Sequence, residues 1–196
     1  MKHWIIALLT AASGLAAAQT APLRLRATIE QADATRITVR ERSGEVVTLA
    51  LADNLVVTEV QPISMQAIQP GAFIGTAALP LPDGTLQALE VHVFPESGRG
   101  TGEGHRPFDL QPGSTMTNAT IADLVGTPQG RRLTLRYKDG EKTVLVPDGT
   151  PIITFKPGER SLLVVGAKVT ITAELREGKP TALRVLAGRD GFVPPL

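Results

Sequence analysis

The chain has 196 residues, with 20 Lys and Arg against 19 Asp and Glu, and it contains no cysteine. The near cancellation of charge disfavours a globally basic nucleic-acid binder. The lack of cysteine excludes disulfide scaffolds, thiolate metal sites and cysteine nucleophiles. Hydrophobic residues make up 42% of the chain, enough for one or two small domains with cores of their own.

Residues 1–18 have the pattern of a secretory signal peptide. Lys2 supplies a positive start, residues 4–15 form an apolar stretch, and Ala16-Ala17-Ala18 offers small residues for cleavage. The apolar stretch is shorter than the ~20 residues that a membrane span requires, and no later segment approaches that length. We therefore expect cleavage after Ala18 and a periplasmic or secreted protein without a transmembrane span.

The rest of the chain contains one pattern twice, at 22–94 and 117–188. Three matches are Ala27-Thr28-Ile29 with Ala119-Thr120-Ile121, Gly71-Ala72 with Gly166-Ala167, and Val91 with Val185. The offset drifts only between 92 and 96, so the insertions are small and fall in turns. A repeat of this length predicts a small domain in each copy, joined by a linker at 95–116.

Each copy is predicted to form five strands and one short helical turn. In the first copy, apolar and polar residues alternate along 23–29 and 36–42, which is typical of strands with one buried face. A third strand carries 47–51, a helical turn covers 62–68, and a last hairpin joins 72–79 to 86–94. Five strands avoid open edges by closing into a barrel. We predict an all-β fold of two tandem OB-like five-stranded barrels.

Three motifs carry a resemblance to a known family. They are Gly44-Glu45 at the second turn, Gln69-Pro70-Gly71 before the fourth strand, and D-G-T-L-x-A-x-x-V from Asp83 to Val91. With them, the chain resembles the small OB-like domains of unknown function in exported bacterial proteins. The second copy departs from the pattern, because Val165 replaces the proline before Gly166.

The linker contains the block R-G-T-G-E-G-H-R-P-F-D from Arg99 to Asp109. This block resembles a group of exported proteobacterial proteins that sometimes carry a metal-transport permease label. A permease needs membrane-spanning segments, and the sequence offers none after the leader, so the permease function is not expected here.

Three interpretations of the linker compete, because a connection of this length is usually functional or disordered. In the first, glycine amides and arginines bind an anion. In the second, His and carboxylate side chains bind a divalent metal such as zinc. In the third, which we favour, the loop is structural: it docks across both barrels, Phe108 fills a groove, and Arg99 or Arg106 pairs with Glu103 or Asp109. The ligand-binding candidates are Arg99, Glu103, His105, Arg106 and Asp109, of which the two arginines would bind an anion. The metal candidates are Glu103, His105, Asp109 and His92.

Basic residues should share the outer face of the first hairpin, since they alternate with its apolar positions. They are Arg24, Arg26, Arg36 and Arg40. This face could bind a polyanion, although charged strand faces also serve to prevent edge aggregation, and few aromatic residues are available for stacking on bases.

The sequence predicts no enzyme, because neither His92 nor His105 accompanies a nucleophile motif. The extended tail at 189–196 is expected to pack through Phe192. We therefore predict an exported, non-enzymatic binding or assembly module that needs no cofactor. Its partner is an envelope protein or an anionic ligand rather than a nucleic acid.

Overall fold

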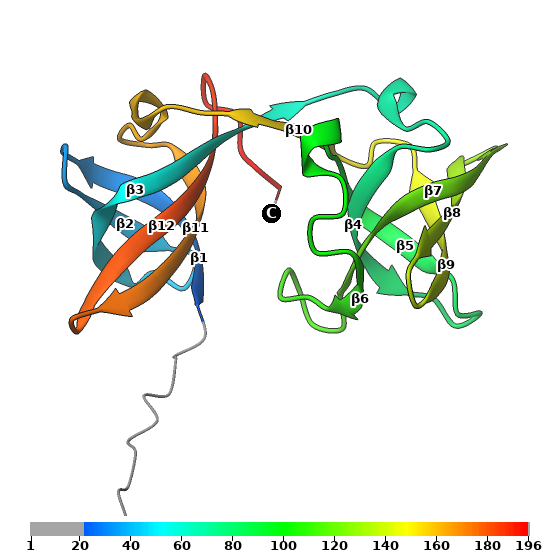
Figure 1. Ribbon diagram of the computed structural model, residues 1–196, viewed down its shortest axis with the longest axis horizontal. Helices are drawn as coiled ribbons and strands as arrows, with labels where there is room; N and C mark the ends of the chain where they lie inside the picture. The colour runs from blue at the N-terminus through cyan, green and yellow to red at the C-terminus, as the bar shows by residue number, and fades with distance from the viewer. Residues whose placement is uncertain (1–21, 196) are drawn as a thin grey trace, which may run out of the picture.

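Period-two alternation of apolar and polar residues produces twelve strands in the computed structural model, which describes residues 22–195 (Figure 1). The predicted signal peptide lies outside these residues. The all-β prediction is confirmed, and the strands close into five-stranded barrels. Within residues 22–195, no helix has the length and apolar character of a membrane span.

Barrel 1 combines the two ends of the described chain. Its strands are β1 (Leu23–Ala32), β2 (Arg36–Glu41), β3 (Val46–Pro62), β11 (Lys168–Arg176) and β12 (Lys179–Gly188). Around the barrel they follow the order β1-β2-β3-β12-β11, and β11 pairs with β1 to close it. Only the β3–β12 pairing is parallel. Ile29, Ile37 and Ile171 are among its fully buried core residues.

Barrel 2 is built from one continuous stretch of chain. Its strands are β4 (Phe73–Pro80), β5 (Leu86–Val93), β7 (Thr115–Thr127), β8 (Gly130–Tyr137) and β9 (Gly140–Pro147). They follow the order β7-β8-β9-β5-β4, and β4 pairs with β7. The parallel pairing here joins β5 to β9. A separate core contains Ile74, Ile121 and Leu133.

The barrels do not follow the sequence repeats, so 22–94 and 117–188 are wrong as boundaries of the two folded units. Each barrel takes three strands from one repeat and its closing hairpin from the other. The hairpin β4–β5 of the first repeat closes barrel 2, and the hairpin β11–β12 of the second repeat closes barrel 1. Barrel 2 is therefore inserted between β3 and β11.

A two-stranded ribbon between the barrels explains this exchange. The 17-residue strand β3 continues out of barrel 1 and pairs with β10 (Ile152–Pro157). In this ribbon Val60 pairs with Phe155. The two residues are equivalent positions of the repeats, because they are separated by the same number of residues as Gly71 and Gly166. Pairing of equivalent residues in antiparallel strands is the contact of a two-fold symmetric dimer. The two repeats are thus related as two subunits that have exchanged hairpins.

The remaining elements are short. The helical turns predicted in the two repeats are single 3-10 turns, η1 (Met65–Ala67) and η3 (Arg160–Leu162). The linker forms a further turn, η2 (Glu96–Gly98), and the strand β6 (Gly104–Pro107), which pairs with β7. Sequence analysis did not predict β6.

The tail folds back onto the junction between the barrels, and Phe192 packs in a small cluster with Val60 and Ile153, as predicted. Arg189 holds the start of the tail through Glu59 on β3, with 2.6 Å between Nη2 and Oε2. The Arg189 guanidinium, aided by the Gln61 amide, lowers the pKa of the Glu59 carboxyl to about 2. Glu59 is almost fully buried, so this pair ties the tail to the ribbon.

This pair predicts acid-dependent stability. Because the pKa of Glu59 is lower in the folded protein than its ordinary value of 4.5, its stabilising effect is complete above pH 4.5 and disappears as the pH falls toward 2. We expect Arg189→Gln to lower the melting temperature by several degrees at pH 7, and the difference from wild type to shrink between pH 4.5 and 2.5. Thermal melts monitored by circular dichroism would measure it. A difference that stays constant over this range would contradict the assignment.

Candidate binding site between the barrels

The candidate residues in the linker are held mostly by local partners. Arg99 forms an ion pair with Glu96, with 2.6 Å between Nε and Oε1, and donates to the carbonyl of Gly71. Glu103 accepts a hydrogen bond from the backbone N–H of Lys138, and Arg106 donates to the carbonyl of Gly102. These contacts order the loop, but they do not bring its charged side chains together around one ligand.

The histidines predicted as metal ligands lie in separate environments. Nδ1 of His105 lies 2.8 Å from Oγ1 of Thr117, and burial, together with the charge of Lys142, lowers the pKa of His105. Nε2 of His92 lies 2.8 Å from Oε1 of Glu90, and both side chains are buried. Among the described residues, no three His, Asp or Glu side chains are placed to hold a metal ion.

Asp109 links the linker to barrel 1. It accepts two hydrogen bonds from the Arg26 guanidinium, at 2.9 and 3.1 Å, and lies 3.8 Å from Arg24. Arg26 is the main cause of the lowered pKa of Asp109. Both arginines also stack over the Phe108 ring. The linker thus docks across both barrels, but not through the ion pairs predicted for it. Asp109 pairs with Arg26 of β1 and Arg99 pairs with Glu96, whereas Arg106 and Glu103 contact backbone atoms.

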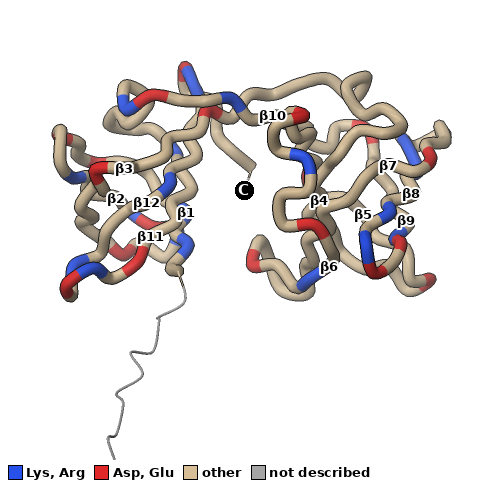
Figure 2. The backbone as a smooth tube through the Cα atoms, in the orientation of Figure 1, with Lys and Arg blue, Asp and Glu red and all other residues tan. Residues whose placement is uncertain are grey.

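Acidic side chains pair with the basic residues of the predicted polyanion face. Arg36 pairs with Asp33 at 3.3 Å, Arg40 pairs with Glu30 at 2.6 Å, and Arg26 is taken by Asp109. Figure 2 shows basic and acidic positions interspersed over both barrels. A mixed surface of this kind keeps a protein soluble but does not concentrate a polyanion.

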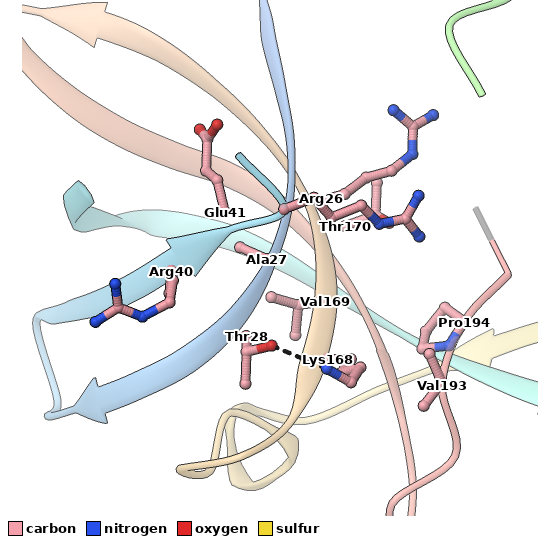
Figure 3. Close-up of a pocket in the computed structure, with 11 residues that line it drawn as sticks. Arg26, Ala27, Thr28, Arg40, Glu41, Lys168, Val169, Thr170, Val193 and Pro194 are labelled. Atoms are coloured by element: carbon pink, nitrogen blue, oxygen red, sulfur yellow. Dashed lines mark hydrogen bonds between the residues drawn. The ribbon is translucent and has the colours of Figure 1, made fainter. Parts of the chain in front are cut away.

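A shallow pocket on the same barrel gathers further basic residues. It measures about 230 Å³ and lies where β1 and β11 meet the tail residues Val193 and Pro194. In Figure 3, Arg40 points away from these tail residues, and Lys168 donates instead to the Thr28 hydroxyl, at 3.2 Å. The charged groups of this pocket do not converge on one point.

A larger cavity, of about 360 Å³, lies between the barrels beside the β3–β10 ribbon. Its volume is in the range of small-molecule sites. It combines basic and aromatic side chains, and no described Asp or Glu side chain lines it. These residues are Arg24, Arg106, Arg184, Phe94, Phe108 and Phe155.

Barrel 1 contributes a hydrogen-bonding wall. Arg24, Thr172 and Arg184 are register partners on β1, β11 and β12, so they form one row across three neighbouring strands. All three line the cavity. Adjacent strands lie ~4.8 Å apart, so the two arginines flank the threonine hydroxyl, and Arg24 also lies 3.8 Å from Asp109. Arg184 has no acidic partner among residues 22–195, and it is therefore available to a ligand.

Barrel 2 contributes an aromatic and amide wall. His92 is oriented by Glu90 and packs edge-on against Phe155, with ring centroids 5.4 Å apart. Asn118 donates to the carbonyl of Thr101, and its Oδ1 is buried without a hydrogen-bond partner. Between them lies Gly75, where a Cβ would come within 2.7 Å of that oxygen. A side chain at position 75 would therefore displace the Asn118 amide.

Sequence analysis named some of these residues but assigned them to other sites. Arg24 and Arg106 do line the cavity, and so does His92. Arg184, Phe94 and Phe155 were missed as site residues, because nothing in their local pattern distinguishes them from ordinary strand positions. Only the exchange of hairpins brings them to face one another.

Comparison of the chain with protein-family models, curated proteins and solved structures found no match.

Proposed function

We propose that this protein is an exported, non-enzymatic binding module whose ligand occupies the cavity between the barrels. The ligand is a small organic anion with a flat or apolar body. The lining carries this proposal: three arginines and three phenylalanines enclose about 360 Å³, without a carboxylate among the described lining residues. Such a lining favours negative charge and apolar surface together.

The barrel topology supports this class of protein. In chain order, the strands of barrel 1 close in the order 1-2-3-5-4-1, with strands 3 and 5 parallel. Barrel 2 has the same arrangement as a circular permutation, in which β7 is counted as the first strand and β4 and β5 as the last two. We propose that both barrels are OB-like, in line with the resemblance to exported bacterial OB-like domains. Proteins with this fold commonly bind ligands on the face of their second and third strands. Here the cavity lies instead on the outer face of β1, β11 and β12. Export rests on the pattern of residues 1–18.

The histidine contacts support a non-catalytic function. Catalysis by a hydroxyl nucleophile needs an accessible hydroxyl beside its base. His105 does contact Thr117, but that threonine is fully buried. His92 contacts Glu90, which orients the imidazole without supplying a nucleophile.

The experiment is calorimetric titration of the folded protein with 8-anilinonaphthalene-1-sulfonate, an aromatic sulfonate. We expect one molecule to bind per chain. Thr172→Trp should abolish binding, because the indole would fill the cavity from the wall of barrel 1 without removing a charge. Thr38→Trp is the matched control, since Thr38 lies on β2 and does not line the cavity. Absence of binding to wild type, or equal binding to both variants, would refute the proposal.

A further inference from the structure

The two walls of the cavity occupy equivalent positions in the duplicated sequence. Arg24 and Met116 are separated by the same number of residues as Ala27 and Ala119. Glu90 and Arg184 are likewise separated by the same number of residues as Val91 and Val185. Thr172 on β11 and Ala77 on β4 are also equivalent, because each lies immediately before a shift in the register of its strand pair. The structure thus contains two versions of one surface, facing each other.

These two versions differ in charge. The row on barrel 1 reads Arg24, Thr172, Arg184, and the equivalent row on barrel 2 reads Met116, Ala77, Glu90. On barrel 2 the acid is fully buried against His92 and does not line the cavity, whereas Met116 does. The wall on barrel 1 therefore offers guanidinium and hydroxyl donors. The other wall offers thioether and aromatic surface beside Arg106 of β6, whose guanidinium already donates to the carbonyl of Gly102.

We infer that the cavity binds its ligand in one orientation, and this inference rests on the proposed function. The anionic head lies on the row formed by Arg24, Thr172 and Arg184, and the apolar body lies against Met116 and Phe94. A carboxylate, sulfate, sulfonate or phosphate fits the head position equally, because each accepts hydrogen bonds from two guanidinium groups and a hydroxyl. The ligand class is therefore a single-headed amphiphilic anion.

The residue that separates this orientation from others is Arg184. We expect Arg184→Gln to weaken binding of 8-anilinonaphthalene-1-sulfonate about ten-fold, the loss expected for one charge-assisted hydrogen bond. Binding of N-phenyl-1-naphthylamine, which has the same rings without the sulfonate, should not change. Met116→Ala should weaken binding of both probes about equally, by a few-fold, because it removes only apolar contact.

Two variants serve as controls. Arg184→Lys should retain part of the affinity, and Arg36→Gln should retain all of it, since Arg36 is exposed and pairs with Asp33 away from the cavity. If Arg184→Gln behaves like Arg36→Gln while Arg106→Gln abolishes binding of the sulfonate, the inferred orientation is wrong and the proposed function still stands. If wild type does not bind the sulfonate at all, both fail.

Competition identifies the head group. Octanoate, octyl sulfate and octyl phosphate should each displace the bound sulfonate probe from wild type, below their micellar concentrations. Octanol, which has the same body without the charge, should not displace it. Equal displacement by octanol would show that apolar contact alone determines binding and would overturn the inference.

Discussion

A fragment containing residues 63–151 is expected to fold as a monomeric barrel, whereas residues 22–94, which form one complete sequence repeat, are not expected to fold. The first fragment contains all five strands of barrel 2 and every buried residue of its separate core except Ile152. The second lacks the hairpin β11–β12, so β1 and β3 lose their closing partners. Unpaired strand edges and exposed core residues favour aggregation. Circular dichroism, thermal unfolding and gel filtration would distinguish the two fragments.

A mixing experiment provides the control. Fragments 22–100 and 101–196 each carry strands of both barrels, and together they supply all twelve. Refolded together, they should form a one-to-one complex that melts cooperatively, and neither should do so alone. If residues 22–94 folded cooperatively as a monomer, each repeat would be able to close on itself, which would contradict the exchange.

The sequence predicted the strands better than their partners. Alternation along 23–29 and 36–42 identifies strands because the buried face of a sheet imposes a period of two wherever it forms. The pattern does not identify which hairpin closes which barrel. The hairpins β4–β5 and β11–β12 come from equivalent parts of the two repeats.

The length of β3 decides between the two arrangements. Sequence analysis placed a strand only at 47–51, but β3 runs from Val46 to Pro62 without a break. Residues 52–55, Ala-Asp-Asn-Leu, carry no alternation that would predict this continuation. The pairing of β3 with β12 shifts register at residues 52–55, and the second half of β3 then continues out of barrel 1 to pair with β10. The next hairpin, β4–β5, therefore joins barrel 2.

The candidate site also depends on the exchange of hairpins between the repeats. The cavity residues in the linker and on β1 can be recognised in the sequence because they are charged and adjacent to glycine or to other arginines. Arg184 and Phe155 can be recognised as site residues only from the strands that face them. A site formed between two folded units is invisible to local pattern, because its residues share neither an element nor a repeat.

Gly130→Ala is expected to destabilise the protein by about 3 kcal/mol or more. Gly130 starts β8 with a φ of +137°, a conformation that residues with a Cβ rarely adopt. A Cβ at this position would also overlap the carbonyl oxygen of Val146 on the neighbouring strand. The strand must move or lose its pairing, and Val146 belongs to the core of barrel 2. Urea unfolding followed by circular dichroism measures the change.

Gly126→Ala is the matched control, because Gly126 lies in the same hairpin, paired with Arg131. No atom lies within 4 Å of the position that its Cβ would take, and its φ is not positive. Its free energy of unfolding should therefore stay within about 0.5 kcal/mol of wild type, as for most exposed substitutions. Equal effects of the two substitutions would show that the β7–β8 hairpin tolerates a side chain at Gly130.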